Sequence, residues 1–180
     1  MMERIDLAPL LKASVQTASC DLVTRSTGAA IRTRIEARIA ASAYPTTHLD
    51  FSAIRLIDLS CADEVVAKLL LGIDQERPRF VMLVNVSDAH RDTIDHVLES
   101  HQLTVAAVPV ETPRPCVLGW RTPDLVAAFE AVQQIGVGDA GRLADRLGWT
   151  VERAADALQS LALRRVVHAA GGIFRPLPTP

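Results

Sequence analysis

The chain has 180 residues, of which 49% are hydrophobic and 22% charged, and its net charge is -2 at pH 7. This length suits one ordinary domain or two small ones and needs no metal or disulfide to build a core. The charge gives no overall electrostatic reason to bind nucleic acid or an anionic membrane. The three cysteines lack zinc-site or disulfide-framework spacing, and neither a signal peptide nor a membrane-spanning run is present, so we expect a cytoplasmic protein.

The first hundred residues alternate between apolar strand-like segments and amphipathic helical ones. Isoleucines at every fourth position predict a helix over residues 29–41. The run from Phe80 to Val86 is almost continuously apolar, which is typical of a central strand covered on both faces. The other predicted strands are 3–7, 20–24, 47–51 and 103–110, with an extended segment at 54–60, further helices at 61–71 and from Ser87 or Asp88 to about 102, and an ambiguous segment at 8–19. This alternation predicts an α/β sandwich with a mixed or parallel sheet.

The pattern changes near residue 114. Three prolines (Pro109, Pro113 and Pro115) fall within seven positions, which indicates a linker or a domain edge. Beyond them, the sequence predicts a helix starting at Thr122-Pro123, helices at 139–147 and 150–163, and strands at 165–168 and 173–177 joined by a turn. Three helices and a hairpin are the outline of a small winged helix-turn-helix domain. We therefore predict two domains, residues 1–114 and 115–180.

The most informative motif runs from the strand end Leu49-Asp50-Phe51-Ser52 to the helix start Asp58-Leu59-Ser60-Cys61-Ala62-Asp63-Glu64. It resembles the STAS-like family of bacterial regulators, whose hallmark is a Ser-x-Ala-Asp-Glu helix start, although Cys61 replaces the family's aromatic residue. The segment from Arg25 through Gly28 to Arg32 resembles a second motif of that family. The resemblance covers roughly residues 20–108 and implies a STAS-like α/β sandwich. It also implies a partner-docking surface at the helix start, formed by Asp58, Leu59, Ser60, Asp63 and Glu64.

Two interpretations of this helix start stay open. In the structural one, Ser60 is the N-cap and the two acidic residues favour the positive end of the helix dipole. In the functional one, the same surface docks a partner. The family's phosphoacceptor directly follows the strand-ending Asp, and that position is Leu59 here, so docking is expected without a phosphorylation switch. Likewise, the segment around Arg25 either holds an anion or, as we prefer, is a cap beside an exposed arginine.

The stretch from Leu143 through Gly148 to Leu158 resembles the helix-turn-helix of winged-helix proteins. The outward face of its second helix would carry Glu152 and Asp156, which repel DNA phosphates unless they contact cytosine amino groups. Residues 117–180 hold seven Arg against six Asp and Glu, which is no clear basic footprint. DNA binding is therefore not favoured; its candidate contacts are Thr150, Arg153, Arg164, Arg165 and Arg175.

We predict no catalytic residue, metal ligand or cofactor, because the sequence contains no nucleophile–base pair, metal-ligand spacing or phosphate-binding loop. The leading hypothesis is a non-enzymatic regulatory protein that docks another protein through its STAS-like domain, in a partner-switching or ATPase-linked signalling system. By family resemblance, the partner is a histidine-kinase-type ATPase or a sigma/anti-sigma component. The winged helix would be a second contact module or would form a homodimer. The alternative is a winged-helix DNA-binding transcriptional regulator, and no membrane partner is expected in either case.

Overall fold

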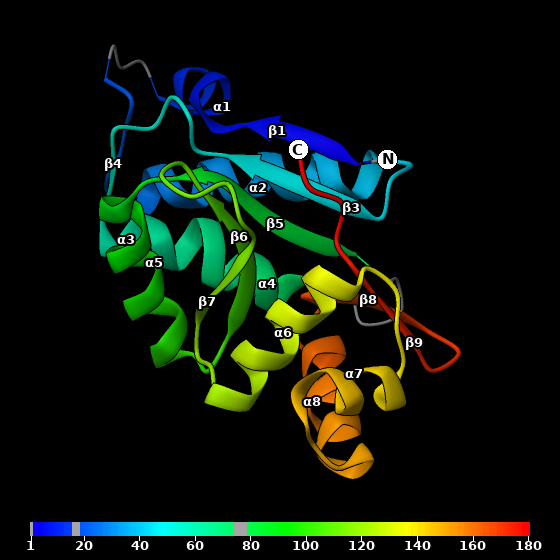
Figure 1. Ribbon diagram of the computed structural model, residues 1–180. Coiled ribbons are helices and arrows are strands. Elements are labelled where there is room, and N and C mark those ends of the chain that lie inside the picture. Colours follow the sequence, from blue (N-terminus) through cyan, green and yellow to red (C-terminus); the bar gives the residue numbers. More distant parts are fainter. Residues whose placement is uncertain (1, 16–18, 74–78) are drawn as a thin grey trace.

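A computed structural model describes residues 2–15, 19–73 and 79–180. Its centre is a five-stranded sheet in the order β1-β3-β5-β6-β7, in which every neighbouring pair is parallel except β6 and β7. This is an α/β fold with a mixed, mostly parallel sheet, as the alternation of segments predicted (Figure 1). The strands are β1 (Glu3–Asp6), β3 (Thr46–Asp50), β5 (Phe80–Val86), β6 (Thr104–Pro109) and β7 (Cys116–Gly119).

One face of the sheet is covered by the helices of the first hundred residues. The segment from residue 59 to 72 is a continuous helix whose middle six residues, η1, form a π-helix. A small parallel sheet of two strands lies beside the start of this helix (Figure 1). The elements are α1 (Leu7–Ser14), β2 (Asp21–Leu22), α2 (Arg25–Ala41), β4 (Leu56–Ile57), α3 (Leu59–Ala62), η1 (Asp63–Lys68), α4 (Leu69–Gly72) and α5 (Asp88–Ser100).

The other face of the sheet is covered by the C-terminal segment. Alternate residues of β5 enter two cores: Val81 and Leu83 pack with the first helices, whereas Met82 and Val84 pack with the C-terminal ones. This arrangement confirms that the apolar run is a central strand covered on both faces. The C-terminal elements are α6 (Pro123–Ile135), α7 (Ala140–Leu147), α8 (Val151–Leu163), β8 (Val167–Ala170) and β9 (Ile173–Pro176).

The boundary expected at residues 114/115 falls inside the central sheet. Strand β7 follows that boundary and pairs with β6, Ala107 opposite Cys116. Pro109 ends β6, and Pro113 and Pro115 lie in the loop of a β-hairpin, where residues without an N–H to donate are tolerated, rather than in a linker between two units. The helices that follow share a core with the sheet.

Several element ends differ from the sequence-based expectation. The ambiguous segment at 8–19 contributes α1, and its residues 16–18 lie outside the described chain. Helix α2 begins at Arg25 rather than at residue 29. The hairpin of β8 and β9 turns on Gly171 and Gly172, both with positive φ (58° and 77°), while the two preceding alanines belong to β8. Within the described residues, no helix is both long enough and apolar enough to cross a membrane.

Candidate functional site

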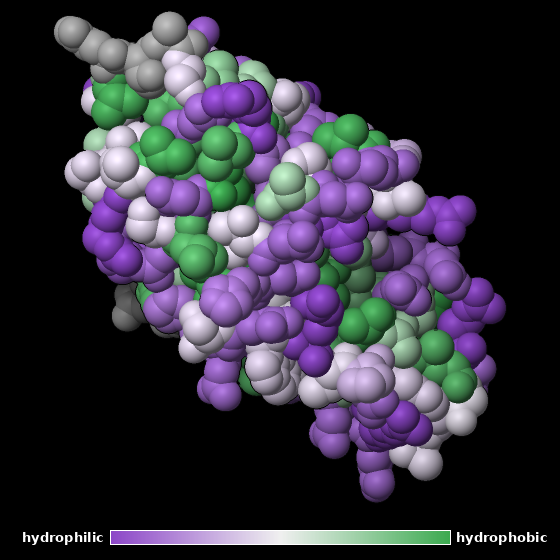
Figure 2. Space-filling model, turned by 90° about the vertical axis from the view of Figure 1, so that its left-hand side faces the viewer, coloured by the Kyte–Doolittle hydropathy of each residue, from purple (hydrophilic) through white to green (hydrophobic). Residues whose placement is uncertain are grey.

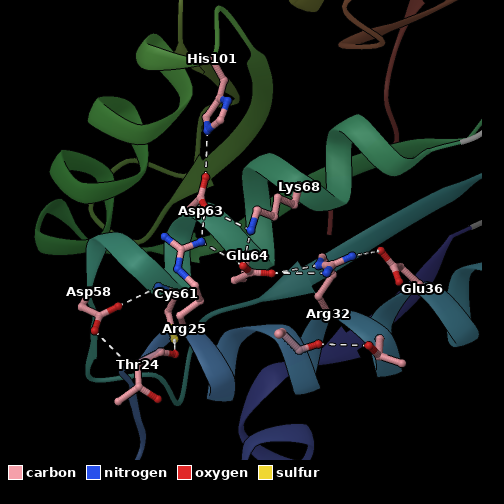
Figure 3. A network of polar contacts seen from close by, with 12 residues as sticks. Thr24, Arg25, Arg32, Glu36, Asp58, Cys61, Asp63, Glu64, Lys68 and His101 are labelled. Atoms are coloured by element: carbon pink, nitrogen blue, oxygen red, sulfur yellow. Dashed lines mark hydrogen bonds and ion pairs between the residues drawn. The ribbon is translucent and has the colours of Figure 1, made fainter.

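The starts of helices α2 and α3 meet, and one carboxylate joins them (Figure 3). Asp58 is the N-cap of α3: its Oδ1 accepts from the backbone N–H of Cys61 at 2.7 Å. Its Oδ2 accepts from the backbone N–H of Thr24 at 2.9 Å. Thr24 has φ 74° and is itself the N-cap of α2. Asp58 therefore ties the two helix starts together by satisfying N–H groups that would otherwise lack partners.

Ser60 was expected to cap this helix, and that prediction is wrong. The cap is Asp58, and the Ser60 hydroxyl donates to Asp58 Oδ1 at 2.8 Å instead. Burial raises the pKa of Asp58, but the hydrogen bonds from Thr24, Cys61 and Ser60 outweigh it and the net pKa is lowered. The carboxylate accepts from several donors at once, which a serine hydroxyl in its place could not do.

Helices α2 and η1 cross at Gly28, which explains the glycine of the second motif. A Cβ at this position would lie 2.9 Å from Glu64 Cβ and 3.1 Å from Cys61 Cα. The buried Cys61 thiol donates to the Thr24 carbonyl at 3.0 Å. Burial, helped by the charge of Asp58, raises the thiol pKa to about 12. Cys61 is therefore a protonated packing residue and no nucleophile at neutral pH.

The carboxylate of Glu64 lies at the centre of a group of cations (Figure 3). Its side chain is only 4% exposed and contacts Arg25 at 3.0 Å, Arg32 at 3.3 Å and Lys68. Burial raises the pKa of Glu64, but the hydrogen bond and charge of Lys68 and the two arginines outweigh it, so the pKa is lowered. Arg32 also contacts Glu36 at 2.8 Å, one turn along α2. The buried carboxylate of Glu64 in η1 therefore holds this helix against α2.

Asp63 occupies the outer part of the same group (Figure 3). Its oxygens contact Arg25 and His101, both at 2.8 Å, and Lys68 at 3.5 Å. His101 is the C-cap of α5, so Asp63 ties this third helix to the cluster. Burial raises the pKa of Asp63, and the hydrogen bonds from Arg25 and His101 reverse that effect, so the net pKa is lowered. Arg25, expected as an exposed arginine beside a helix cap, is 58% exposed and follows the cap Thr24, and it is also an ion-pair partner of η1.

Among the predicted docking residues, only Leu59 has a largely exposed side chain, at 53%. Val23 (38%) and Leu56 (39%) are exposed nearby. Strands β2 and β4 pair Leu22 with Ile57, and both of these are buried. Val23, which directly follows β2, and Leu56, which precedes Ile57 in β4, therefore face outward. We call Val23, Leu56 and Leu59 the apolar patch. Figure 2 views this side of the molecule and shows apolar residues set among polar ones.

Val23 and Leu56 were not predicted as site residues from the sequence. A signal was available, because Leu22-Val23 and Leu56-Ile57 each place two apolar residues side by side in a short strand, and only one of each pair can face the core. The motif's Asp50, by contrast, is buried at the end of β3. It accepts hydrogen bonds from Arg4 Nε of β1 at 2.9 Å and from Asn85 Nδ2 of β5 at 2.8 Å, so it links β3 to the two neighbouring strands of the sheet.

The expected DNA-contact residues are held in different ways. Arg153 forms two hydrogen bonds with Asp124 of α6, at 2.8 and 2.7 Å, and its guanidinium lies 4.3 Å from the centre of the Trp149 ring. The Thr150 hydroxyl caps α8 by accepting from the Arg153 N–H. Arg164 lies over Trp120, and Arg165 donates to the Ile73 carbonyl at 3.4 Å. Arg175 is exposed on β9.

In the part of the chain that the structure describes, no three His, Cys, Asp or Glu side chains gather in a way that could hold a metal ion. A comparison with protein-family models, with curated proteins and with solved structures found no match to this chain.

Proposed function

We propose that this chain is a non-enzymatic, cytoplasmic regulatory protein with a STAS-like α/β unit that docks another protein. The observation that carries the proposal is the apolar patch, in which Val23, Leu56 and Leu59 are exposed around the start of α3. Burying a leucine side chain in an interface contributes up to about 1.5–3 kcal/mol. Three apolar residues held together by a folded helix start can therefore give a partner a specific contact.

The ion-pair cluster behind the patch supports this role by fixing its shape. Asp58 holds the two helix starts together, and Glu64 and Asp63 tie η1 to α2 and α5. A surface that keeps its shape before binding loses less conformational entropy when it binds. Asp63 and Glu64, expected as docking residues, thus act by positioning the patch, with Leu59 making the contact.

The charges around the patch indicate the chemistry of the partner. Arg25 and Arg55 lie next to it in the sequence, and both side chains are more than half exposed although each contacts an acidic residue. A partner with an apolar segment flanked by polar residues that hydrogen-bond to these exposed ion pairs would complement this rim. By the family resemblance, we propose a histidine-kinase-type ATPase or a sigma/anti-sigma component.

The test compares two exposed apolar residues in the same helical position. Leu59 follows the cap of α3, and Val151 (58% exposed) follows the cap of α8. Cross-linking in cells and mass spectrometry would identify the partner, and calorimetry with the purified partner would measure affinity. We expect Leu59→Asp to weaken binding about tenfold or more. Val151→Asp should leave the affinity unchanged. Equal affinities for Leu59→Asp and the parent protein would remove the patch from consideration.

The C-terminal elements support a second proposal, that they form a winged helix. Helices α7 and α8 are joined through Gly148, which has φ 65°, and a β-hairpin follows them. This module would be a second protein contact or a dimerisation element. DNA binding remains the alternative, although Glu152 and Asp156 are exposed on α8 and Arg153 is paired with Asp124. An electrophoretic shift assay with duplex DNA tests it: no binding at low salt would eliminate it.

A further inference from the structure

A cavity of about 360 Å³ lies at the other end of the helix that carries Leu59. It opens between α4 and α8, where β5 and β6 begin. Its walls are largely apolar, from Leu70 and Ile73 on one side and Leu103 and Leu163 on the others. Pockets that enclose small molecules measure about 300–1,000 Å³, so this one suits a small ligand.

Among the described residues, three arginines line this cavity: Arg79, Arg164 and Arg165. Neutral groups accept the hydrogen bonds of Arg79 and Arg164. Arg79 Nη1 donates to the carbonyls of Ser42 and Tyr44, at 3.0 and 2.7 Å. Arg164 Nη1 donates to the Gln102 carbonyl at 2.9 Å and to the Thr104 hydroxyl at 3.1 Å. Within residues 2–15, 19–73 and 79–180, neither arginine forms an ion pair with a carboxylate, and neither donates a hydrogen bond from Nε or Nη2.

The surroundings of Arg164 make it energetically costly to keep its positive charge without a carboxylate partner. Its guanidinium is partly buried and lies 4.0 Å from the centre of the Trp120 ring. Burial lowers its pKa. A partly desolvated cation is stabilised most by an anion that accepts two parallel N–H bonds. The cavity thus combines apolar walls with two guanidinium groups that each keep donors for such an acceptor.

We propose that this cavity binds a small amphipathic organic anion. Its carboxylate or phosphate would be held by Arg79 and Arg164, and its apolar part would lie against Leu70, Leu103 and Leu163. The inference does not depend on the docking function, since it rests on a different end of the molecule.

The experiment titrates the full-length protein with octanoate, octyl phosphate and 1-octanol by calorimetry. These probes share one apolar chain, and the two acids separate carboxylate from phosphate recognition. We expect at least one anion to bind at a single site with a Kd below about 1 mM, and octanol to bind about tenfold more weakly or not at all. Absence of saturable binding by both anions, or equal binding of octanol, would overturn the proposal.

Variants then place the site. Arg79→Met and Arg164→Met should each weaken anion binding about tenfold, because each removes one charge-assisted contact. Arg146→Met, on the exposed side of α7, is the matched control and should leave binding unchanged. If an arginine variant fails to fold, Leu163→Glu still tests whether the anion binds in this cavity. Leu163 is 74% exposed at the rim, so a carboxylate there should compete with the ligand while the fold persists. Unchanged affinity in Leu163→Glu and in every folded arginine variant would place the ligand elsewhere and refute the site.

Discussion

Two pairs of arginines lie around the helix of residues 59–72, and they differ in the groups that accept their hydrogen bonds. Arg25 and Arg32, near its first half, contact the carboxylates of Asp63, Glu64 and Glu36. Arg79 and Arg164, which line the cavity at its end, donate to backbone carbonyls and a hydroxyl. Arginine therefore has two roles around this helix, one in ion pairs that stabilise the fold and one beside a cavity, and the hydrogen-bond acceptors of each arginine distinguish the two roles.

The difference follows from the cost of burying charge. A buried ion pair contributes little net stability, yet removing one partner is expensive because the other charge stays behind. The first pair of arginines is thus part of the structure, since the buried carboxylate of Glu64 depends on it. The second pair keeps free donors beside a cavity, and that surplus is what a ligand can use.

The largest effect should follow from removing the central carboxylate of the first group. Glu64→Gln leaves Arg25, Arg32 and Lys68 without their shared acid, so we expect the free energy of unfolding to fall by about 2–4 kcal/mol. Urea unfolding at pH 7 measures it. Glu36→Gln is the matched control, because Glu36 is 40% exposed and, among the described residues, forms an ion pair only with Arg32. Its loss should stay below about 1 kcal/mol. Equal losses for the two variants would mean that the cluster is not structural.

The buried core of the fold was predictable from periodicity. The apolar run of β5 indicated a strand covered on both faces, and the second cover is the C-terminal helices. Strand β7 was missed because four residues after a proline cluster carry too little pattern to separate a strand from a loop. The domain boundary was misplaced for the same reason.

The site was harder to predict than the core. Aspartate and serine are both good N-caps, so pattern alone could not choose Asp58 over Ser60 two positions later. The pairing of Arg25 with Asp63 joins residues 38 apart in the chain, and helical periodicity says nothing about contacts between helices. What the motif did locate is the neighbourhood: Leu59 lies in the apolar patch, and Asp58, Asp63 and Glu64 hold that region together.

The two pairs of arginines should also differ in how their contribution to the free energy of unfolding depends on acidic pH. The pKa values of Asp63 and Glu64 are lowered in the folded protein, so the unfolded chain takes up protons first as the pH falls. Their contribution is complete above the pKa values of the unfolded chain and is lost as the pH drops from about 5 through the folded-state values. Urea unfolding at pH 7, 5 and 4 should show a shallower loss for Glu64→Gln than for the parent protein. Parallel curves for the two proteins would contradict the assigned role of Glu64.

The smallest effect on stability should come from the cavity arginines, although their effect on binding is large. Arg164→Met loses hydrogen bonds to neutral acceptors but also removes a partly desolvated charge, and methionine keeps apolar contact with Trp120. We expect the free energy of unfolding to change by less than about 1 kcal/mol, with the same acid dependence as the parent protein. Urea unfolding without any ligand measures this. A loss as large as that of Glu64→Gln would mean that Arg164 serves the fold, and the contrast between the two pairs would then disappear. If Arg164→Met loses little stability but binds octanoate or octyl phosphate more weakly, Arg164 is a ligand contact. An arginine without a carboxylate partner in the fold can be lost with little cost to folding, and its free N–H donors remain available to bind the anion.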